Sequence, residues 1–441
     1  MLMDGRLPSA ESPGDARVPA GSPGVRLPRG SMAALALAIL LAVAGGMGAS
    51  ATATTPPDAA AYQRDLNFFW ISDLIGGLAV LALFLSSGWG GRLGAVLSRR
   101  LGGPVRATTA MIVIVLAAQS LAGLPLAWCK GFWHEHVFGL STETAGHWAA
   151  DQATALVVQS VIALVLGWIP ALLLVRLTRF WWLGLWAALC PVLIATMVVV
   201  PVAILPLFHH YAPMADRDLE TGLRAEAARV GLGDAPILVM DQSTTSKVPG
   251  AYVAGLFGTA RIVLYDTLLE KMTPAQVRFV MGHEMKHYLL GDAWKAIGAF
   301  LIVMLPGLVL IDRSGRAILR RWGGRIGARQ LAEPAAIPLL LALLSLVSLV
   351  TNPILNQGSI SIEHEADRFG LELTRDNEAA AGTFRLLQAE VLQPDDPDWF
   401  QRIFRLDHPA LKDRIDFART YHPWTEGRPL VYGARMAASP P

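Results

Sequence analysis

The chain has 441 residues, of which 53% are hydrophobic and only 16% are charged. Soluble globular proteins carry about 25% charged residues, so this composition is typical of a membrane protein and excludes a disordered, collagen-like or coiled-coil chain. Two cysteines exclude a disulfide scaffold and a cysteine-based zinc finger, and a net charge of +2 gives no basic excess to indicate a nucleic-acid partner.

Seven apolar stretches are long enough to enter or cross a bilayer, for which about 20 residues are needed. Residues 180–214 contain no Asp, Glu, Lys or Arg, which is rare in a core helix of a soluble protein. The last two stretches are short and contain Pro306 and Pro338, so buried or tilted helices of a soluble domain are the alternative there. The stretches are 32–49, 68–88, 107–128, 153–175, 180–208, 296–311 and 335–351.

The first stretch has two interpretations. Arg26 and Arg29 precede the apolar run 33–44, and small residues follow at 49–51, which is the layout of a cleavable signal peptide. A retained first membrane helix fits equally well. Residues 1–31 are rich in Pro, Gly and Arg, so we expect a flexible tail, or sequence upstream of the true start if translation begins at Met32.

The other stretches divide the rest of the chain. We expect an N-terminal membrane domain over 68–208, a domain over 209–420 that includes the spans 296–311 and 335–351, and a C-terminal tail over 421–441.

Arginines gather in three of the loops between the stretches. With seven spans, or with six after a cleaved signal, these loops fall on one face of the membrane, which the positive-inside rule makes cytoplasmic. The polar segments 209–295 and 352–441 are then extracytoplasmic. Binding of lipid head groups or acidic partners is the other interpretation of these arginines. They are Arg92, Arg99, Arg100, Arg106, Arg176, Arg179, Arg313, Arg316, Arg320, Arg321, Arg325 and Arg329.

The first polar segment carries an H-E-x-x-H motif, His283-Glu284-Met285-Lys286-His287. On a helix, the two histidines are four residues apart and share a face, as two ligands of one tetrahedral zinc ion must. Glu284 lies beside them, where a general base reaches a zinc-bound water. A solvated helix face with incidental histidines is the alternative.

The residues around the motif predict that it lies on a helix. Thr273, Pro274 and Gln276 have the pattern of an N-cap, a first-turn proline and the glutamine of a capping box. Gly291 follows the motif, and glycine is the residue type that most often ends a helix. The helix is therefore expected to begin after Thr273 and to end before Gly291.

Zinc needs a third protein ligand. A histidine six residues after His287 would mark a metzincin, but that position is an alanine. The other common third ligand is a glutamate on a later helix. Glu363 can bind the metal in this way, and Asp367, four residues later on the same face, can orient a ligand histidine. His364 and Glu365 point elsewhere on this helix and are interpreted as an exposed charged face.

The two histidines followed by E-x-x-x-D resemble the gluzincin arrangement, and the flanking segments resemble the zinc-dependent type I CAAX prenyl endopeptidases. The similar segments occur in the family's order over roughly residues 68–420. They are FWHEHVFGLSTETAGHWAAD (132–151), LPLFHHYAPMADRDLETGL (205–223), RIVLYDTLL (261–269) and HPALKDRI (408–415).

The resemblance implies a mostly α fold: a polytopic membrane helix bundle with a gluzincin-type zinc protease core that contains a short antiparallel sheet. It implies one zinc ion per chain on His283, His287 and Glu363, with Glu284 as the base and Asp367 behind the ligands.

The resemblance also assigns residues to the substrate. His408 and Arg414 are expected to face the site and to hold the substrate carbonyl or the tetrahedral intermediate. Residues 251–257 read as a short edge strand that pairs with an extended peptide, so Gly250, Ala251 and Tyr252 are predicted to bind substrate.

The chain departs from the family at three places. Gly250 stands where the family usually has Asn before the Ala-Tyr pair, and Ile360 follows Ser359 where the family tends towards Ser-Arg. Lys286 and Tyr288 stand where Gly and Trp are common. None of these changes removes a metal ligand or the base, but they leave open whether the substrate is prenylated.

The sequence therefore predicts a multi-pass integral membrane zinc metalloendopeptidase, in a bacterial inner membrane. Its partners are membrane lipids and a peptide or membrane-associated protein substrate, lipidated or not, and no nucleic acid. The alternatives are a quality-control protease that ignores prenyl groups, an inactive ligand-binding relative, and a transporter-like protein with incidental histidines. The resemblance places the catalytic domain in the cytosol, against the arginine pattern.

Overall fold

The computed structural model describes residues 58–256 and 260–437. The predicted tail 1–31 and the first apolar stretch, 32–49, lie outside the described residues, and the signal-peptide interpretation lies outside them as well. Six helices of the described part are long and apolar enough to cross a membrane, and they coincide with the other six predicted stretches.

Most of the membrane-length helices extend beyond their apolar stretches into polar residues, whereas the helix over Trp181–Leu207 stays within the stretch 180–208. Asp58 caps the start of α2 with a carboxylate that accepts hydrogen bonds from two first-turn amides, and Thr144 caps α6 with a hydroxyl that accepts from the His147 amide. These helices are α2 (Ala59–Ser86), α4 (Pro104–Trp128) with η1 (Cys129–His134) and α5 (Glu135–Val137), α6 (Ala145–Arg176), α7 (Trp181–Val199) with η2 (Val200–Ile204) and η3 (Leu205–Leu207), α11 (Asp292–Ile326), and α12 (Ile337–Thr374) preceded by η5 (Pro334–Ala336).

The last two spans are not the short, interrupted helices expected from the sequence. α11 is 35 residues long and continues through Pro306 without a break. Pro338 lies in the first turn of α12, where its missing N–H costs no helical hydrogen bond. Both helices therefore run from the membrane-spanning bundle into the region formed by the polar segments 209–295 and 352–437, which is called the polar part below. Asp292 begins α11 and Glu363 lies near the end of α12, so the two spans carry polar residues directly to the predicted site.

The polar part holds a four-stranded sheet in the order β1-β2-β4-β3. The β1–β2 and β3–β4 pairs are antiparallel, but β2 and β4 are parallel, so the sheet is mixed and the expected antiparallel sheet is corrected. Parallel strands need a long connection, which the segment 241–260 provides by including β3. The strands are β1 (Tyr211–Pro213), β2 (Ile237–Met240), β3 (Ala251–Ala254) and β4 (Arg261–Tyr265).

Strand β4 forms the centre of the core of the polar part. Ile262, Val263 and Leu264 are fully inaccessible to solvent, and Ile262 and Leu264 share a buried cluster with Phe369 of α12. Short helices make up the rest of the polar part, and some of them contribute side chains to this core. They are α8 (Arg217–Ala228), η4 (Gln242–Thr244), α9 (Asp266–Lys271), α10 (Pro274–Leu289), α13 (Asn377–Glu390), η6 (Gln401–Arg405), α14 (Leu411–Thr420) and α15 (Gly433–Ala437).

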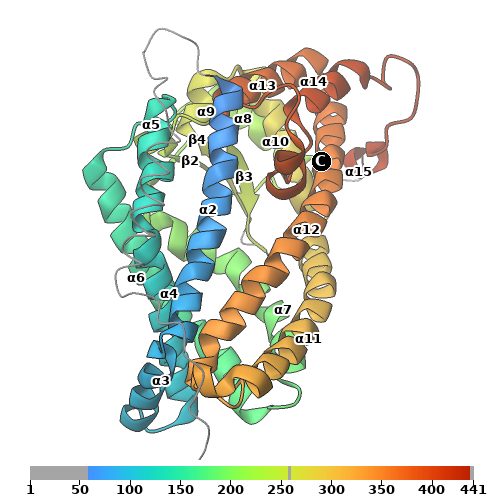
Figure 1. The fold of residues 1–441 in the computed structure, drawn as a ribbon. Helices are drawn as coiled ribbons and strands as arrows, with labels where there is room; N and C mark the ends of the chain where they lie inside the picture. Colours follow the sequence, from blue (N-terminus) through green and yellow to red (C-terminus); the bar gives the residue numbers. More distant parts are fainter. Residues whose placement is uncertain (1–57, 257–259, 438–441) are drawn as a thin grey trace, which may run out of the picture. The chain divides into compact units, whose positions relative to one another are not determined.

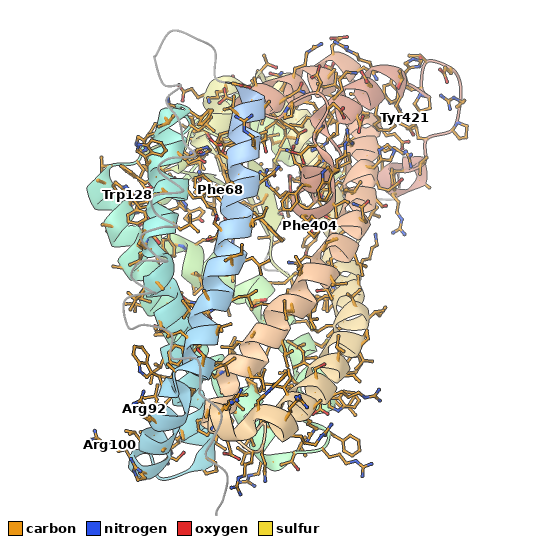
Figure 2. The ribbon with its side chains drawn as sticks, in the orientation of Figure 1. Phe68, Arg92, Arg100, Trp128, Phe404 and Tyr421 are labelled. Atoms are coloured by element: carbon orange, nitrogen blue, oxygen red, sulfur yellow. The ribbon has the colours of Figure 1, made fainter. Side chains whose placement is uncertain are left out.

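The arginine-rich segments meet at the end of the spans opposite the sheet. Figure 1 shows the sheet, α10, α13 and α14 at one end and α3 (Trp89–Arg100) at the other, and Figure 2 shows Arg92 and Arg100 beside α3. The end of α11 contacts α3 closely, since a Cβ on Gly327 would lie 2.7 Å from the Cα of Gly91. The Trp181 indole joins α7 to Asp312 of α11 with a hydrogen bond of 2.6 Å.

Candidate metal centre

Helix α10 carries the H-E-x-x-H motif, and its start is built as the sequence predicts. The Thr273 hydroxyl accepts from the Gln276 amide at 3.4 Å, and the Gln276 side chain accepts from the Thr273 amide at 2.9 Å. This reciprocal pair is the expected capping box. Gly291, with φ of 62°, follows the helix. His283 and His287 therefore lie on one face of a well-defined helix.

Two glycines let α10 pack closely against α12. A Cβ on Gly282 would lie 3.2 Å from the Cα of Gly370, and a Cβ on Gly370 would lie 3.0 Å from the ring of Phe279. A larger side chain at either position would push the helices apart. The close approach brings the histidine face of α10 against the turn of α12 that carries Glu363.

Three side chains suited to metal binding converge between α10 and α12. His283 Nε2 lies 3.1 Å from Glu363 Oε2, His287 Nε2 lies 3.5 Å from Glu363 Oε1, and the two Nε2 atoms are 3.3 Å apart. The ligand atoms all lie within 4.8 Å of one another. Glu363 Oε2 is buried and has no hydrogen-bond partner among the described residues. Two imidazoles and one carboxylate that converge in this way fit a zinc ion.

Each histidine of this triad is oriented by an aspartate behind it. His283 Nδ1 lies 2.9 Å from Asp367 Oδ1, and His287 Nδ1 lies 3.0 Å from Asp292 Oδ2. Each ring thus donates its Nδ1–H to a carboxylate and presents Nε2 to the other ligands, as metal-binding histidines do. Asp367 lies where the sequence predicts it. Asp292 was not predicted; its only signal is an acidic residue directly after the glycine that ends α10.

Lys286, one of the departures from the family, is buried behind the triad. Its side chain is 1% exposed, and its Nζ donates to Asp292 Oδ2 at 2.8 Å and to the carbonyl of Ile362 at 2.7 Å. The ammonium group therefore connects α10 to the start of α11 and to the residue before Glu363. It fixes the relative position of three helices that contribute to the site.

Arg414, from α14, pairs with Asp367. Its guanidinium donates to Asp367 Oδ2 at 2.9 Å and to Oδ1 at 2.6 Å, and it stacks over the ring of Phe384 at 4.3 Å. Arg414 is 8% exposed and Asp367 is fully buried. The observed contacts of Arg414 are thus with the residue that orients His283, and its predicted contact with the substrate carbonyl stays a prediction.

His408 reaches the triad from the loop before α14. Its Nε2 lies 3.2 Å from Glu363 Oε2, its Nδ1 lies 2.7 Å from Asp407 Oδ1, and its side chain is 46% exposed. The sequence assigned this histidine to the site only through the family resemblance. The structure brings this half-exposed side chain to Glu363, beside the triad.

The electrostatics of α10 suit proton transfer and metal binding. Burial raises the pKa of the Glu284 carboxyl above its ordinary value, which favours a group that accepts and returns a proton. Burial lowers the pKa of His283, but its hydrogen bond to Asp367 and its contact with the Glu363 carboxylate outweigh this and hold the pKa at about 9. Because zinc binds neutral imidazole, the raised pKa of His283 means that protons would compete with a metal ion for this side chain.

The strand β3 lies beside α10 and at the edge of the sheet. Among the described strands it pairs with β4 alone, so its other edge is available to an extended peptide. The Tyr252 hydroxyl lies 3.2 Å from that of Tyr211. A Cβ on Gly250 would lie 2.7 Å from the ring of Tyr265, so any side chain there must displace that ring. This contact explains glycine at the position where the family usually has Asn.

The two other candidates on α12 point away from the triad. Glu365 accepts hydrogen bonds from Arg368 and from the Tyr432 hydroxyl. The His364 ring packs against Phe417, with ring centroids 4.4 Å apart. Neither side chain belongs to the triad.

Comparisons with known proteins identify the family. Residues 213–422 match the model of peptidase family M48, and residues 49–210 match the CAAX prenyl protease N-terminal domain, which has five membrane helices. The uncharacterized metalloprotease YhfN of Bacillus subtilis is 31% identical over 315 residues, covering 70% of this chain and 73% of that protein. The chain belongs to peptidase family M48.

Other relatives of this M48 protein are CAAX prenyl proteases. The CAAX prenyl protease 1 homolog of Dictyostelium discoideum is 27% identical and covers 57% of this chain and 59% of that protein. CAAX prenyl protease 1 of Saccharomyces cerevisiae is 32% identical over 40% of this chain and 39% of that protein. The crystal structure of S. mikatae Ste24p has the same fold, with a TM-score of 0.68, 22% identity, and coverage of 87% of this chain and 94% of that chain.

These findings confirm the predicted class of protein. The chain is a multi-pass integral membrane metalloprotease of the CAAX prenyl protease family, and its M48 domain makes it a zinc-dependent peptide hydrolase. The mostly helical fold with a membrane bundle and a protease core is confirmed as well.

Proposed function

We propose that this M48 protein cleaves peptide bonds with one zinc ion per chain, held by His283, His287 and Glu363. The observation that carries the proposal is the convergence of these three side chains, all ligand atoms lying within 4.8 Å of one another. Bound zinc polarises the scissile carbonyl and lowers the pKa of the attacking water.

The surrounding residues divide the remaining tasks. Glu284 takes a proton from the attacking water and passes it to the leaving amine. His408 lies on the open side of Glu363 and donates a hydrogen bond to the developing oxyanion, a contribution of about 3 kcal/mol in comparable sites. Asp367 and Asp292 keep the histidine rings in place, and Arg414 supports Asp367.

The substrate is proposed to bind as an extra strand. The free edge of β3 begins at Ala251 and Tyr252, directly after Gly250, and its backbone groups hold an extended chain without regard to the sequence of that chain. We further propose that the chain is divided into a membrane domain, 68–208, a protease domain, 209–420, and a C-terminal tail, 421–441.

Removal of zinc is expected to abolish cleavage of a quenched peptide by the detergent-purified protein, and one equivalent of zinc is expected to restore it. Metal analysis should find one zinc ion per chain, lost in His283→Ala. The matched control is His422→Ala, since His422 is 39% exposed and pairs only with Glu426 and Thr425 among the described residues. Full activity of the zinc-free protein, or two zinc ions per chain, would refute the proposal.

The proposed substrate is a membrane-associated protein with a prenylated C-terminus, which the names of the relatives support. We expect one peptide to be cleaved at least tenfold more efficiently, by kcat/KM, with its prenyl group than without it. Gly250 favours the second candidate, a quality-control protease, because it lacks the side chain that the family usually places there. Equal rates for the two peptides would establish that second candidate.

We propose that the sheet end of the spans is extracytoplasmic, because α3, with Arg92 and Arg100, and the arginine-rich end of α11 that contacts it lie at the opposite end. In a background with Cys129→Ser and Cys190→Ser, a membrane-impermeant maleimide is expected to label Thr244→Cys in intact cells. Ser98→Cys, on α3 at the arginine end, is expected to react only after lysis; both native residues are exposed. The reverse labelling pattern would place the protease domain in the cytosol.

A further inference from the structure

A groove opens on the outer face of the helix bundle between α4 and α6. Its volume is about 490 Å³, which lies in the range of ligand pockets. Leu164 and Val165 of α6, which line it, are 58% and 61% exposed, so the groove faces the surroundings of the bundle. The lining residues are Leu101, Arg106, Thr109, Ala110, Leu164, Val165 and Trp168.

One end of the groove is suited to an anion. Arg106 lies in the first turn of α4, where no side chain caps the helix and no acidic residue is present. The unpaired amides of a helix N-terminus carry a partial positive charge. A Cβ on Gly102 or Gly103 would meet nothing within 4 Å, so the space before the helix is open. Residues 89–110 contain four arginines and no Asp or Glu.

A buried hydroxyl without a partner lies one turn further along the groove. Thr109 is 4% exposed, and its Oγ1 has no hydrogen-bond partner among the described residues. Buried hydroxyls are normally paired, as in the neighbouring Thr108, whose hydroxyl donates to the carbonyl of Ala332. Thr109 follows Arg106 by three residues, so both lie on one face of α4, about 4.5 Å apart along its axis.

The rest of the groove is apolar. Ala110 continues the α4 side, and Leu164 and Val165 form the α6 side. Trp168 is 49% exposed and lies on α6 two turns before the helix ends at Arg176, and tryptophans towards the end of a membrane helix are suited to contact lipid head groups. Along the membrane normal, the groove thus passes from positive charge to a lone hydroxyl and then to an apolar channel.

We propose that this groove binds one anionic phospholipid of the leaflet on the arginine side. The phosphate lies at the N-terminus of α4 and pairs with Arg106. The Thr109 hydroxyl donates to an ester carbonyl oxygen, and an acyl chain lies along Ala110, Leu164 and Val165. A net negative head group is preferred because a zwitterionic one brings its own cation to a site that already holds positive charge.

The proposal is tested on the full-length protein in detergent, by native mass spectrometry with phosphatidylglycerol and phosphatidylcholine of identical chains. We expect one retained phosphatidylglycerol and at least a fivefold preference over phosphatidylcholine, in keeping with the attraction of one arginine for an anionic head group. Arg106→Gln should remove the preference, and Ala110→Trp, which fills the groove, should remove retention of both lipids. Inorganic phosphate at millimolar concentration should not compete, because it lacks the acyl chain.

Arg320→Gln is the matched control, since Arg320 is an exposed arginine on α11 at the same end of the bundle. It should retain phosphatidylglycerol as the unchanged protein does. Equal retention of the two lipids, unchanged retention by Arg106→Gln, or an equal loss in Arg320→Gln would overturn the proposal. If Ala110→Trp fails to fold, Thr109→Val provides the second variant, with a loss of affinity of at least threefold expected.

Discussion

Glu284→Gln is expected to lower kcat/KM for a quenched peptide by about 10²–10⁴-fold while the protein keeps its zinc. The amide has the shape of the carboxylate but cannot accept a proton from the attacking water. Glu284 is not part of the triad that converges on the proposed metal position, so metal content should not change. Steady-state kinetics and metal analysis of the same preparation measure both quantities.

Glu365→Gln is the control for this variant. It makes the same chemical change on α12, two residues after Glu363, on a side chain that bonds to Arg368 and Tyr432 outside the triad. It should cleave the peptide at the unchanged rate. Wild-type activity of Glu284→Gln would refute the role of the base, and a loss of zinc along with activity would make Glu284 a metal ligand instead.

Asp367→Asn is expected to weaken zinc binding by about 10–100-fold, the usual effect of removing a carboxylate that orients a ligand histidine. It should also destabilise the fold by about 3–5 kcal/mol, because Arg414 would keep its charge in a buried position without its carboxylate. Zinc affinity is measured by competition with a chromogenic chelator, and stability by thermal unfolding in detergent.

A second buried carboxylate on the same helix separates the two effects. Glu372 is 1% exposed and accepts from the Tyr421 hydroxyl and from the amides of Val431 and Tyr432, far from the triad. Glu372→Gln is expected to lower the unfolding temperature and leave zinc affinity unchanged. If both variants lost zinc affinity equally, the role of Asp367 would be structural only.

Local sequence determined the parts of the site that lie within one helix. The capping pattern at Thr273 and Gln276 set the start of α10, and a spacing of four residues placed His283 and His287 on one face. The same spacing placed Glu363 and Asp367 together on α12. Hydropathy located the six spans of the described part from local sequence as well, because an apolar run of sufficient length has few stable environments other than a membrane.

Only the tertiary structure decided which side chains of other helices contact the site residues on α10 and α12. Asp292 reaches His287 because Gly291 turns the chain between α10 and α11, and Lys286 is buried because three helices meet around it. Arg414 turned out to pair with Asp367, although 47 residues separate them. The parallel pairing of β2 with β4 and the continuation of α11 through Pro306 also depend on packing between distant segments. Spacing within a helix is fixed by backbone geometry, whereas contacts between helices depend on how closely glycines such as Gly282 and Gly370 let them approach.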